Sequence, residues 1–111
     1  MKLTWLGQAG YRLRAENGMV IYIDPYLSDS LLMEKGETYT RQVPIREEDL
    51  TAHVDVLILT HLHGDHTDFP TIDRLAAHNP TMAVMAPLNV LNALRARYPQ
   101  VPLHYMLFDR G

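Results

Sequence analysis

The chain has 111 residues, a length that allows one hydrophobic core and excludes a second domain of ordinary size. Its 13 acidic and 10 basic residues are scattered along the sequence, and the lack of a Lys/Arg stripe argues against a nucleic-acid partner. There is no cysteine, so disulfides and thiolate metal sites are excluded and any metal must be held by His, Asp and Glu.

Three short strands are predicted near the N-terminus, at residues 3–6, 11–15 and 19–23. In the second of these, apolar residues alternate with two arginines, which is typical of a strand with one buried face. Asn17 and Gly18 separate the second and third strands, and both tolerate the positive φ angles of a tight primed turn. The chain is therefore predicted to open as an antiparallel meander.

A long irregular segment follows, from Asp24-Pro25 to about Pro44, with one helical turn predicted at residues 30–35. Beyond this segment we expect a short helix over residues 46–50. Residues 54–59 are rich in β-branched side chains and almost continuously apolar, which predicts a strand that is buried on both faces.

The remainder of the chain alternates helices with strands. We predict helices over residues 69–77 and 88–98, and strands over residues 83–86 and 103–108. An antiparallel opening followed by strands that alternate with helices is typical of a mixed sheet with helices on at least one face. The sequence therefore predicts an α/β (α+β) fold.

Three histidines and a carboxylate follow the apolar strand directly, in the sequence His61-Leu62-His63-Gly64-Asp65-His66. Because residues two apart in an extended chain project to the same side, His61 and His63 can converge on one ion. Gly64 permits a sharp change of direction, so that Asp65 and His66 can face a second ion about 3.5–4 Å from the first. The remaining histidines are interpreted as surface or partly buried residues: His53, His78 and His104.

The motif His61-Leu62-His63-Gly64-Asp65-His66 resembles the HxHxDH signature of the metallo-β-lactamase superfamily, in its usual place after a hydrophobic strand. Asp24, at the end of an earlier predicted strand, is similar in position to an Asp that recurs in the family. The opening Thr4-Trp5-Leu6-Gly7-Gln8-Ala9-Gly10-Tyr11 resembles the branch that contains ascorbate-6-phosphate lactonase and related predicted hydrolases.

This resemblance implies that His61 and His63 bind one divalent metal ion and that Asp65 and His66 bind a second. Zinc is expected, with manganese as the alternative. Two such ions lower the pKa of a shared water, and attack by the resulting metal-bound hydroxide is the expected reaction. Asp65 is the expected catalytic residue, because it can orient the water and move its proton to the leaving group. Asp24 either fixes the motif loop by hydrogen bonds or stabilises a turn.

The sequence departs from the family pattern after His66, where the family has a further His, a bridging Asp and a last His. The histidines that remain, His78 and His104, lack the expected loop context. Residues 1–111 are therefore expected to form a partial domain, the N-terminal half of an αββα sandwich with helices on the outer face of its mixed sheet. Such a half would bind metal weakly, because a catalytic zinc usually has three protein ligands.

Three functions remain open at this point. The first is a cytoplasmic metal-dependent hydrolase of a small-molecule lactone or phosphoester, of which this chain supplies part. The second is a non-catalytic metal-binding or self-associating module, since an uncovered half-sheet favours a homo-oligomer. The third is a nuclease of the superfamily, which the scattered basic residues disfavour. No membrane partner is expected, because no apolar run has the length of a membrane span.

Overall fold

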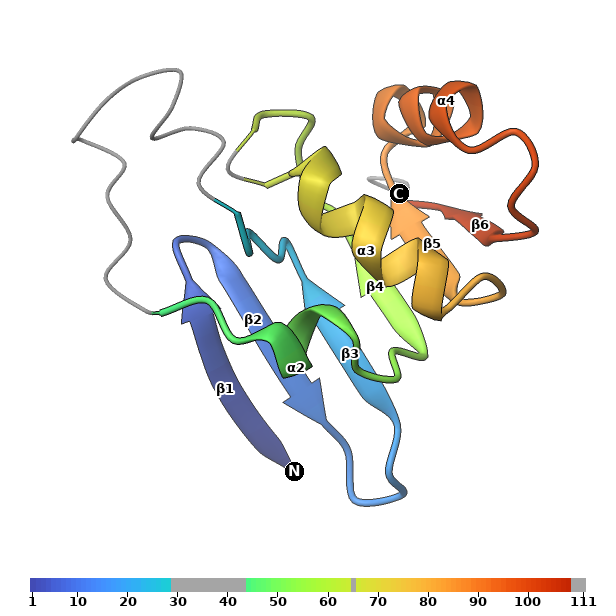
Figure 1. The fold of residues 1–111 in the computed structure, drawn as a ribbon. Coiled ribbons are helices and arrows are strands. Elements are labelled where there is room, and N and C mark those ends of the chain that lie inside the picture. Colours follow the sequence, from blue (N-terminus) through green and yellow to red (C-terminus); the bar gives the residue numbers. More distant parts are fainter. Residues whose placement is uncertain (29–43, 65, 109–111) are drawn as a thin grey trace, which may run out of the picture.

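The computed structural model describes residues 1–28, 44–64 and 66–108, which form a six-stranded sheet and three helices (Figure 1). The strands lie side by side in chain order: β1 (Lys2–Gly7), β2 (Gly10–Arg14), β3 (Val20–Ile23), β4 (Val56–Ile58), β5 (Ala83–Ala86) and β6 (His104–Leu107). The helices are α2 (Glu47–Leu50), α3 (Phe69–His78) and α4 (Leu88–Arg97). None of these described helices is long and apolar enough to cross a membrane.

The first three strands form the predicted antiparallel meander, but the turn between β2 and β3 is not the predicted one. Ala15 N donates to Met19 O over 2.9 Å, and Gly18 N donates to Ala15 O over 3.0 Å. Gly18 has a φ of 89°, whereas Asn17 lies outside the left-handed region. The connection is a three-residue loop in which the last residue alone takes a positive φ, so the prediction of a tight primed turn was wrong.

The second half of the sheet is parallel, as strands alternating with helices require. β3 pairs with β4, β4 with β5, and β5 with β6, each in parallel register. The predicted short helix is confirmed as α2, and the two longer predicted helices as α3 and α4. The helical turn predicted at residues 30–35 lies outside the described residues. Together the two halves confirm the predicted mixed sheet.

The helices cover one face of the sheet, and α2 and α3 cross in front of it in Figure 1. Leu57 of β4 and Val84 of β5 pack there with Ile72 and Leu75 of α3 and Leu94 of α4, and all five side chains are fully buried. Burial of an aliphatic side chain of this size contributes about 1.5–3 kcal/mol, so this core holds the sheet and the helices together.

The opposite face of the sheet carries a second apolar surface. Cross-strand pairing places one row of side chains across five strands on this face: Trp5, Tyr11, Ile23, Ile58 and Met85. Trp5 is 45% exposed and Tyr11 is 38% exposed, while the other three are partly exposed. We call this row the open apolar face. The helices of the described residues direct their buried side chains into the other face.

β4 shows the difference between the two faces most directly. Leu57 is fully buried under the helices, whereas its neighbours Val56 and Ile58, which project from the other side of the sheet, are only partly buried. The prediction that residues 54–59 are buried on both faces is therefore correct for the face under the helices and wrong for the opposite face. Val56 and Ile58 are therefore apolar side chains that remain partly in contact with solvent.

Candidate metal centre

Asp24 follows β3 directly and is a buried carboxylate beside the motif, with 3% of its surface exposed. Its backbone N donates to Ile58 O over 2.9 Å, so that it is tied to the end of β4. Its φ of 44° lies in the left-handed region, which Asp tolerates better than most residues. The parallel pairing of β3 with β4 thus brings Asp24 to the strand ends from which the histidine motif starts.

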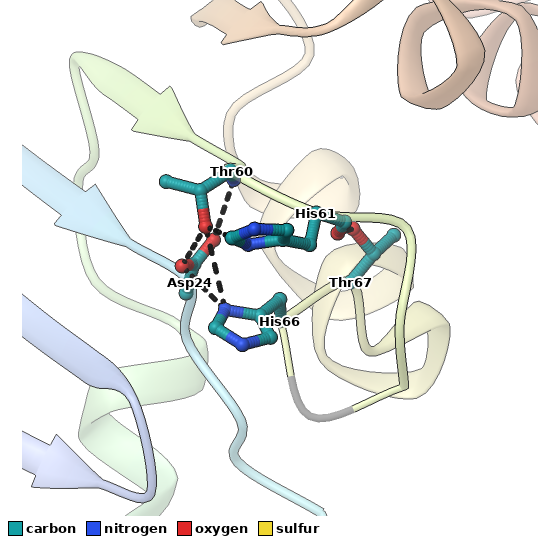
Figure 2. A network of polar contacts seen from close by, with 5 residues as sticks. All are labelled: Asp24, Thr60, His61, His66 and Thr67. Carbon is teal, nitrogen blue, oxygen red and sulfur yellow. Dashed lines mark hydrogen bonds and ion pairs between the residues drawn. The ribbon is translucent and has the colours of Figure 1, made fainter.

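The Asp24 carboxylate is surrounded by polar groups of the motif segment, as Figure 2 shows. Its Oδ1 accepts a hydrogen bond from Thr60 N over 2.8 Å, and its Oδ2 accepts one from Thr60 Oγ1 over 2.5 Å. His66 Nδ1 lies 2.7 Å from the same Oδ2. A buried carboxylate must be compensated by such partners, and here the partners are the first and last parts of the motif loop.

The side chains of His61 and His66 lie next to each other, although four residues of the chain separate them. Their ring centroids are 4.7 Å apart, with the planes at 55°. His61 Nδ1 lies 2.9 Å from Thr60 Oγ1, and His66 Nδ1 lies 3.3 Å from the same oxygen. We call Asp24, Thr60, His61 and His66 the Asp24 cluster (Figure 2).

A hydrogen-bonded turn returns the chain to the cluster after His63. His66 N and Thr67 N both donate to His63 O, over 2.9 and 2.8 Å. Thr67 Oγ1, which is buried, donates to His61 O over 2.5 Å. The His63 ring lies parallel to that of His61, with centroids 6.1 Å apart and an interplanar angle of 9°. The two rings thus lie face to face, and their convergence on one ion stays a prediction.

The three motif histidines (His61, His63 and His66) form a donor set that suits zinc or manganese, because imidazole is a good ligand for borderline divalent ions. Asp65, the fourth expected ligand, lies outside the described residues. Within residues 1–28, 44–64 and 66–108, no three His, Asp or Glu side chains are arranged as a preformed metal site. The chemistry of the donors therefore fits a divalent ion, while no three of them in the described part are arranged around one ion as catalytic zinc usually requires.

The turn between β1 and β2 packs against the backbone of Asp24. A Cβ atom added at Gly10 would lie 2.9 Å from Asp24 O and 3.2 Å from Pro25 Cα, so only a glycine fits without movement. Trp5 Nε1 donates to Gln8 O over 2.8 Å and fixes the turn from the other side. The first hairpin therefore sets the position from which the Asp24 side chain reaches the motif.

The first turn of α3 holds the segment that follows Asp24. Leu27 N donates to Thr71 Oγ1 over 2.8 Å, and Ser28 Oγ donates to Asp68 Oδ2 over 2.7 Å. Thr71 Oγ1 itself donates to the same Asp68 oxygen over 2.5 Å. α3 begins shortly after His66. The segment after Asp24 and the segment after His66 are therefore both attached to the start of this helix.

The histidines outside the motif lie on the surface, as the sequence indicates. His53, His78 and His104 are all exposed. His53 Nε2 lies 2.8 Å from Asp55 Oδ1 at the opposite end of β4, and His78 Nδ1 lies 3.1 Å from Arg74 O. Neither contact joins these side chains to the Asp24 cluster.

Sequence reasoning named the motif residues and Asp24 but missed Thr60 and Gly10. Thr60 precedes the first motif histidine directly, and a hydroxyl in that place was a usable signal because it can reach the neighbouring ring. The role of Gly10 depends on the contact between the first hairpin and β3, which no local pattern reveals.

Comparison with known proteins agrees with this description. Residues 20–106 match the sequence profile of the beta-lactamase superfamily domain. A metal-dependent hydrolase from Polynucleobacter asymbioticus is 34% identical over 101 residues, which are 86% of this chain and 32% of that protein. One from Paracoccus denitrificans is 43% identical over 67 residues, 60% of this chain and 25% of that protein. The chain thus spans a third or less of the length of these relatives.

A solved structure has the same fold. The crystal structure of a possible metal-dependent hydrolase from Veillonella parvula superposes with a TM-score of 0.62 at 20% sequence identity. The match covers 99% of this chain and 46% of that one. At this level of identity the likeness concerns the fold alone, and it extends over less than half of the Veillonella parvula chain.

Proposed function

This chain belongs to the beta-lactamase superfamily, and we propose that it supplies metal-binding residues of a metal-dependent hydrolase. The observation that carries the proposal is the position of the motif histidines beside a buried carboxylate. In sheets with parallel strands, functional groups gather at the carboxyl ends of the strands, and the Asp24 cluster lies at the carboxyl ends of β3 and β4. The names of the relatives support the same activity.

Two divalent ions, most simply zinc with manganese as the alternative, would be held by His61 with His63 and by Asp65 with His66. The imidazole and carboxylate donors support this assignment, and the lack of cysteine leaves no thiolate competitor. Two ligands for each ion are fewer than catalytic zinc usually has, so we expect weak binding by the 111-residue chain.

The reaction that we propose is hydrolysis of a lactone or phosphoester of a small molecule. A bound divalent ion supplies a water of lowered pKa and polarises the bond under attack. Asp65 would orient the attacking water and accept its proton for transfer to the leaving group. Asp24 and Thr60 hold the motif loop in place, because their hydrogen bonds join its two ends.

Metal counting combined with activity measurement tests this proposal. The purified chain is loaded with zinc or manganese, its bound metal is counted, and lactone and phosphodiester hydrolysis are assayed beside Asp65→Asn. His53→Ala is the matched control, because it removes a histidine from the far end of β4. The proposal predicts metal-dependent turnover that Asp65→Asn abolishes and His53→Ala preserves. Turnover that is independent of metal, or unaffected by Asp65→Asn, would reject it.

We further propose that residues 1–111 form a partial domain, the N-terminal half of an αββα sandwich. The open apolar face supports this, since Trp5 and Tyr11 leave more apolar surface in water than a finished sheet face would. The chain also matches less than half of the superposed structure. A second sheet packed on this face would complete the layers.

A self-associating module is the second candidate function, and the open apolar face is the observation that favours it. Two copies could cover this face for each other in an isologous dimer. Sedimentation velocity with and without zinc tests it, using Trp5→Ser to remove the largest exposed side chain of the row. A concentration-dependent dimer that Trp5→Ser weakens supports the module, and a monomer at every concentration excludes it.

A nuclease function is less favoured, because three of the arginines are paired with acidic residues. Arg12 contacts Asp49 over 2.9 Å, and Arg97 binds Asp73 with two hydrogen bonds of 2.8 and 2.7 Å. Arg74 likewise pairs with a glutamate of α2. Cations that are neutralised in this way contribute little to binding a phosphate backbone.

A further inference from the structure

Thr60 Oγ1 lies within 3.3 Å of the buried carboxylate and of both neighbouring histidines, and this hydroxyl has only one proton to donate. An ionised carboxylate is purely an acceptor. Across the 2.5 Å contact with Asp24 Oδ2, the proton must therefore come from Thr60 Oγ1. The main chain of Thr60 also donates to Oδ1, so this residue is held at two points.

The direction of this hydrogen bond determines the next one. Since the Thr60 hydroxyl gives its proton to Asp24, its oxygen can only accept from His61 Nδ1, which lies 2.9 Å away. Neutral imidazole has one N–H and one nitrogen with a lone pair. His61 is thereby restricted to the form that carries its proton on Nδ1 and its lone pair on Nε2.

His66 is directed in the same sense by the carboxylate itself. Its Nδ1 lies 2.7 Å from Asp24 Oδ2, an acceptor, so His66 also carries its proton on Nδ1. Two rings with centroids 4.7 Å apart thus share one tautomer that is set from one carboxylate. The two contacts differ in one respect, because His66 is reached directly and His61 only through Thr60.

We propose that Thr60 is a positioning residue that fixes the metal-binding tautomer of His61 by relaying the hydrogen-bond polarity of Asp24. A metal binds the nitrogen that carries the lone pair, and a hydrogen bond on the other nitrogen selects it and orients the ring. This inference rests on the proposed function, in which His61 is a metal ligand. It assigns to the threonine hydroxyl a task that packing alone does not require.

The substitution Thr60→Val tests the relay, because valine keeps the shape of threonine and removes the hydroxyl. Thr60→Ser is the matched control, since it keeps the hydroxyl and removes the methyl group. Long-range 1H–15N NMR of the histidine rings is recorded on the metal-free 111-residue chain at alkaline pH, where imidazoles are neutral. The expected result is the Nδ1–H form of His61 in the wild type and in Thr60→Ser, and its loss in Thr60→Val.

Two results would overturn the inference. One is a wild-type His61 that carries its proton on Nε2. This measurement uses the wild-type chain alone and does not depend on whether a variant folds. The other is a folded Thr60→Val chain in which His61 keeps the Nδ1–H form. His66 serves as the internal reference, because its tautomer is set by Asp24 directly and should survive Thr60→Val.

Zinc titration against a competing chelator separates this inference from the proposed function. Loss of a group that orients a metal ligand typically lowers affinity roughly 10-fold to 100-fold. Thr60→Val should show such a loss, and Thr60→Ser should stay close to the wild type. If the tautomers behave as stated but no chain binds zinc, the proposed function fails and the tautomer relay stands. If zinc binds and His61 carries its proton on Nε2, the relay fails and the proposed function stands.

Discussion

The two ends of β4 each carry a histidine beside an aspartate, and only their surroundings differ. His53 Nε2 and Asp55 Oδ1 are 2.8 Å apart at the start of the strand, with 73% and 34% of the two side chains exposed. His66 Nδ1 and Asp24 Oδ2 are 2.7 Å apart at its carboxyl end, with 22% and 5% exposed. A short contact between histidine and carboxylate therefore does not identify a functional site. The two ends differ in burial and in the number of further donors nearby, and the proposed metal site rests on these two differences.

The exposed pair has a structural explanation. Asp55 Oδ2 accepts a hydrogen bond from Val20 N over 2.9 Å and so ties the start of β3 to β4. This bond, together with the contact to His53, holds the pKa of the Asp55 carboxyl below its ordinary value. At the other end, Asp24 accepts from Thr60 and meets His66, so its partners belong to the motif rather than to a strand end.

Removal of a histidine should show the largest contrast between the two ends. His61→Ala or His66→Ala removes a proposed ligand, and zinc affinity should fall by more than about 100-fold, beyond the range for groups that only support a ligand. His53→Ala should leave the affinity unchanged. Competition with a chelator measures all three. Equal losses for His53→Ala and His66→Ala would mean that zinc does not distinguish the two ends.

Substitution of the two aspartates, Asp24 and Asp55, should change zinc affinity by nearly as different amounts. Asp24→Asn replaces an acceptor with an NH2 group that faces Thr60 Oγ1 or His66 Nδ1, while Asn still tolerates the φ of 44°. We expect a loss of zinc affinity of roughly 10-fold to 100-fold. Asp55→Asn, the same change at the other end, should bind zinc as the wild type does. An unchanged zinc affinity in Asp24→Asn would mean that Asp24 does not support the zinc ligands.

Two glycines allow the same comparison at the level of the backbone. Gly10→Ala places a Cβ 2.9 Å from Asp24 O, and the shift that follows should cost about 1–3 kcal/mol and weaken zinc binding. Gly18→Ala meets no atom within 4 Å, but its φ of 89° is strained for alanine, at about 1–2 kcal/mol. Urea unfolding should show both losses. Zinc titration should show a loss of affinity for Gly10→Ala and none for Gly18→Ala. An unchanged affinity in Gly10→Ala would mean that the first hairpin does not position the metal site.

The smallest expected effect is a change in how stability depends on acid, tested at the exposed pair His53 and Asp55. Because the folded chain lowers the pKa of Asp55 from its ordinary 3.8, the ionised carboxylate stabilises the fold above that pH. This contribution is lost as the pH falls toward the folded pKa. Asp55→Asn should remove it, a change of up to about 1 kcal/mol for so exposed a pair. Urea unfolding near neutrality and in acid measures it, and a constant difference between the two chains would contradict it.

Much of the fold could be predicted because it depends on local patterns. The parallel half follows from helices alternating with apolar strands, and the motif is contiguous in sequence. The Asp24 cluster is different, since Thr60 lies 36 residues from Asp24 and meets it only through the register of β3 with β4. The prediction for the loop at Asn17 and Gly18 was wrong because an Asn-Gly pair suits a two-residue primed turn and a three-residue loop alike. Contacts set by register were thus beyond the reach of local patterns.

The most direct test of the proposed metal site is zinc titration of the 15N-labelled chain, followed through the ring signals of its six histidines. We predict that the signals of the three motif histidines move together as zinc is added, while those of His53, His78 and His104 remain in place. Changes confined to these last three, or no change in any ring at saturating zinc, would contradict the proposal that the carboxyl end of β4 is a metal site.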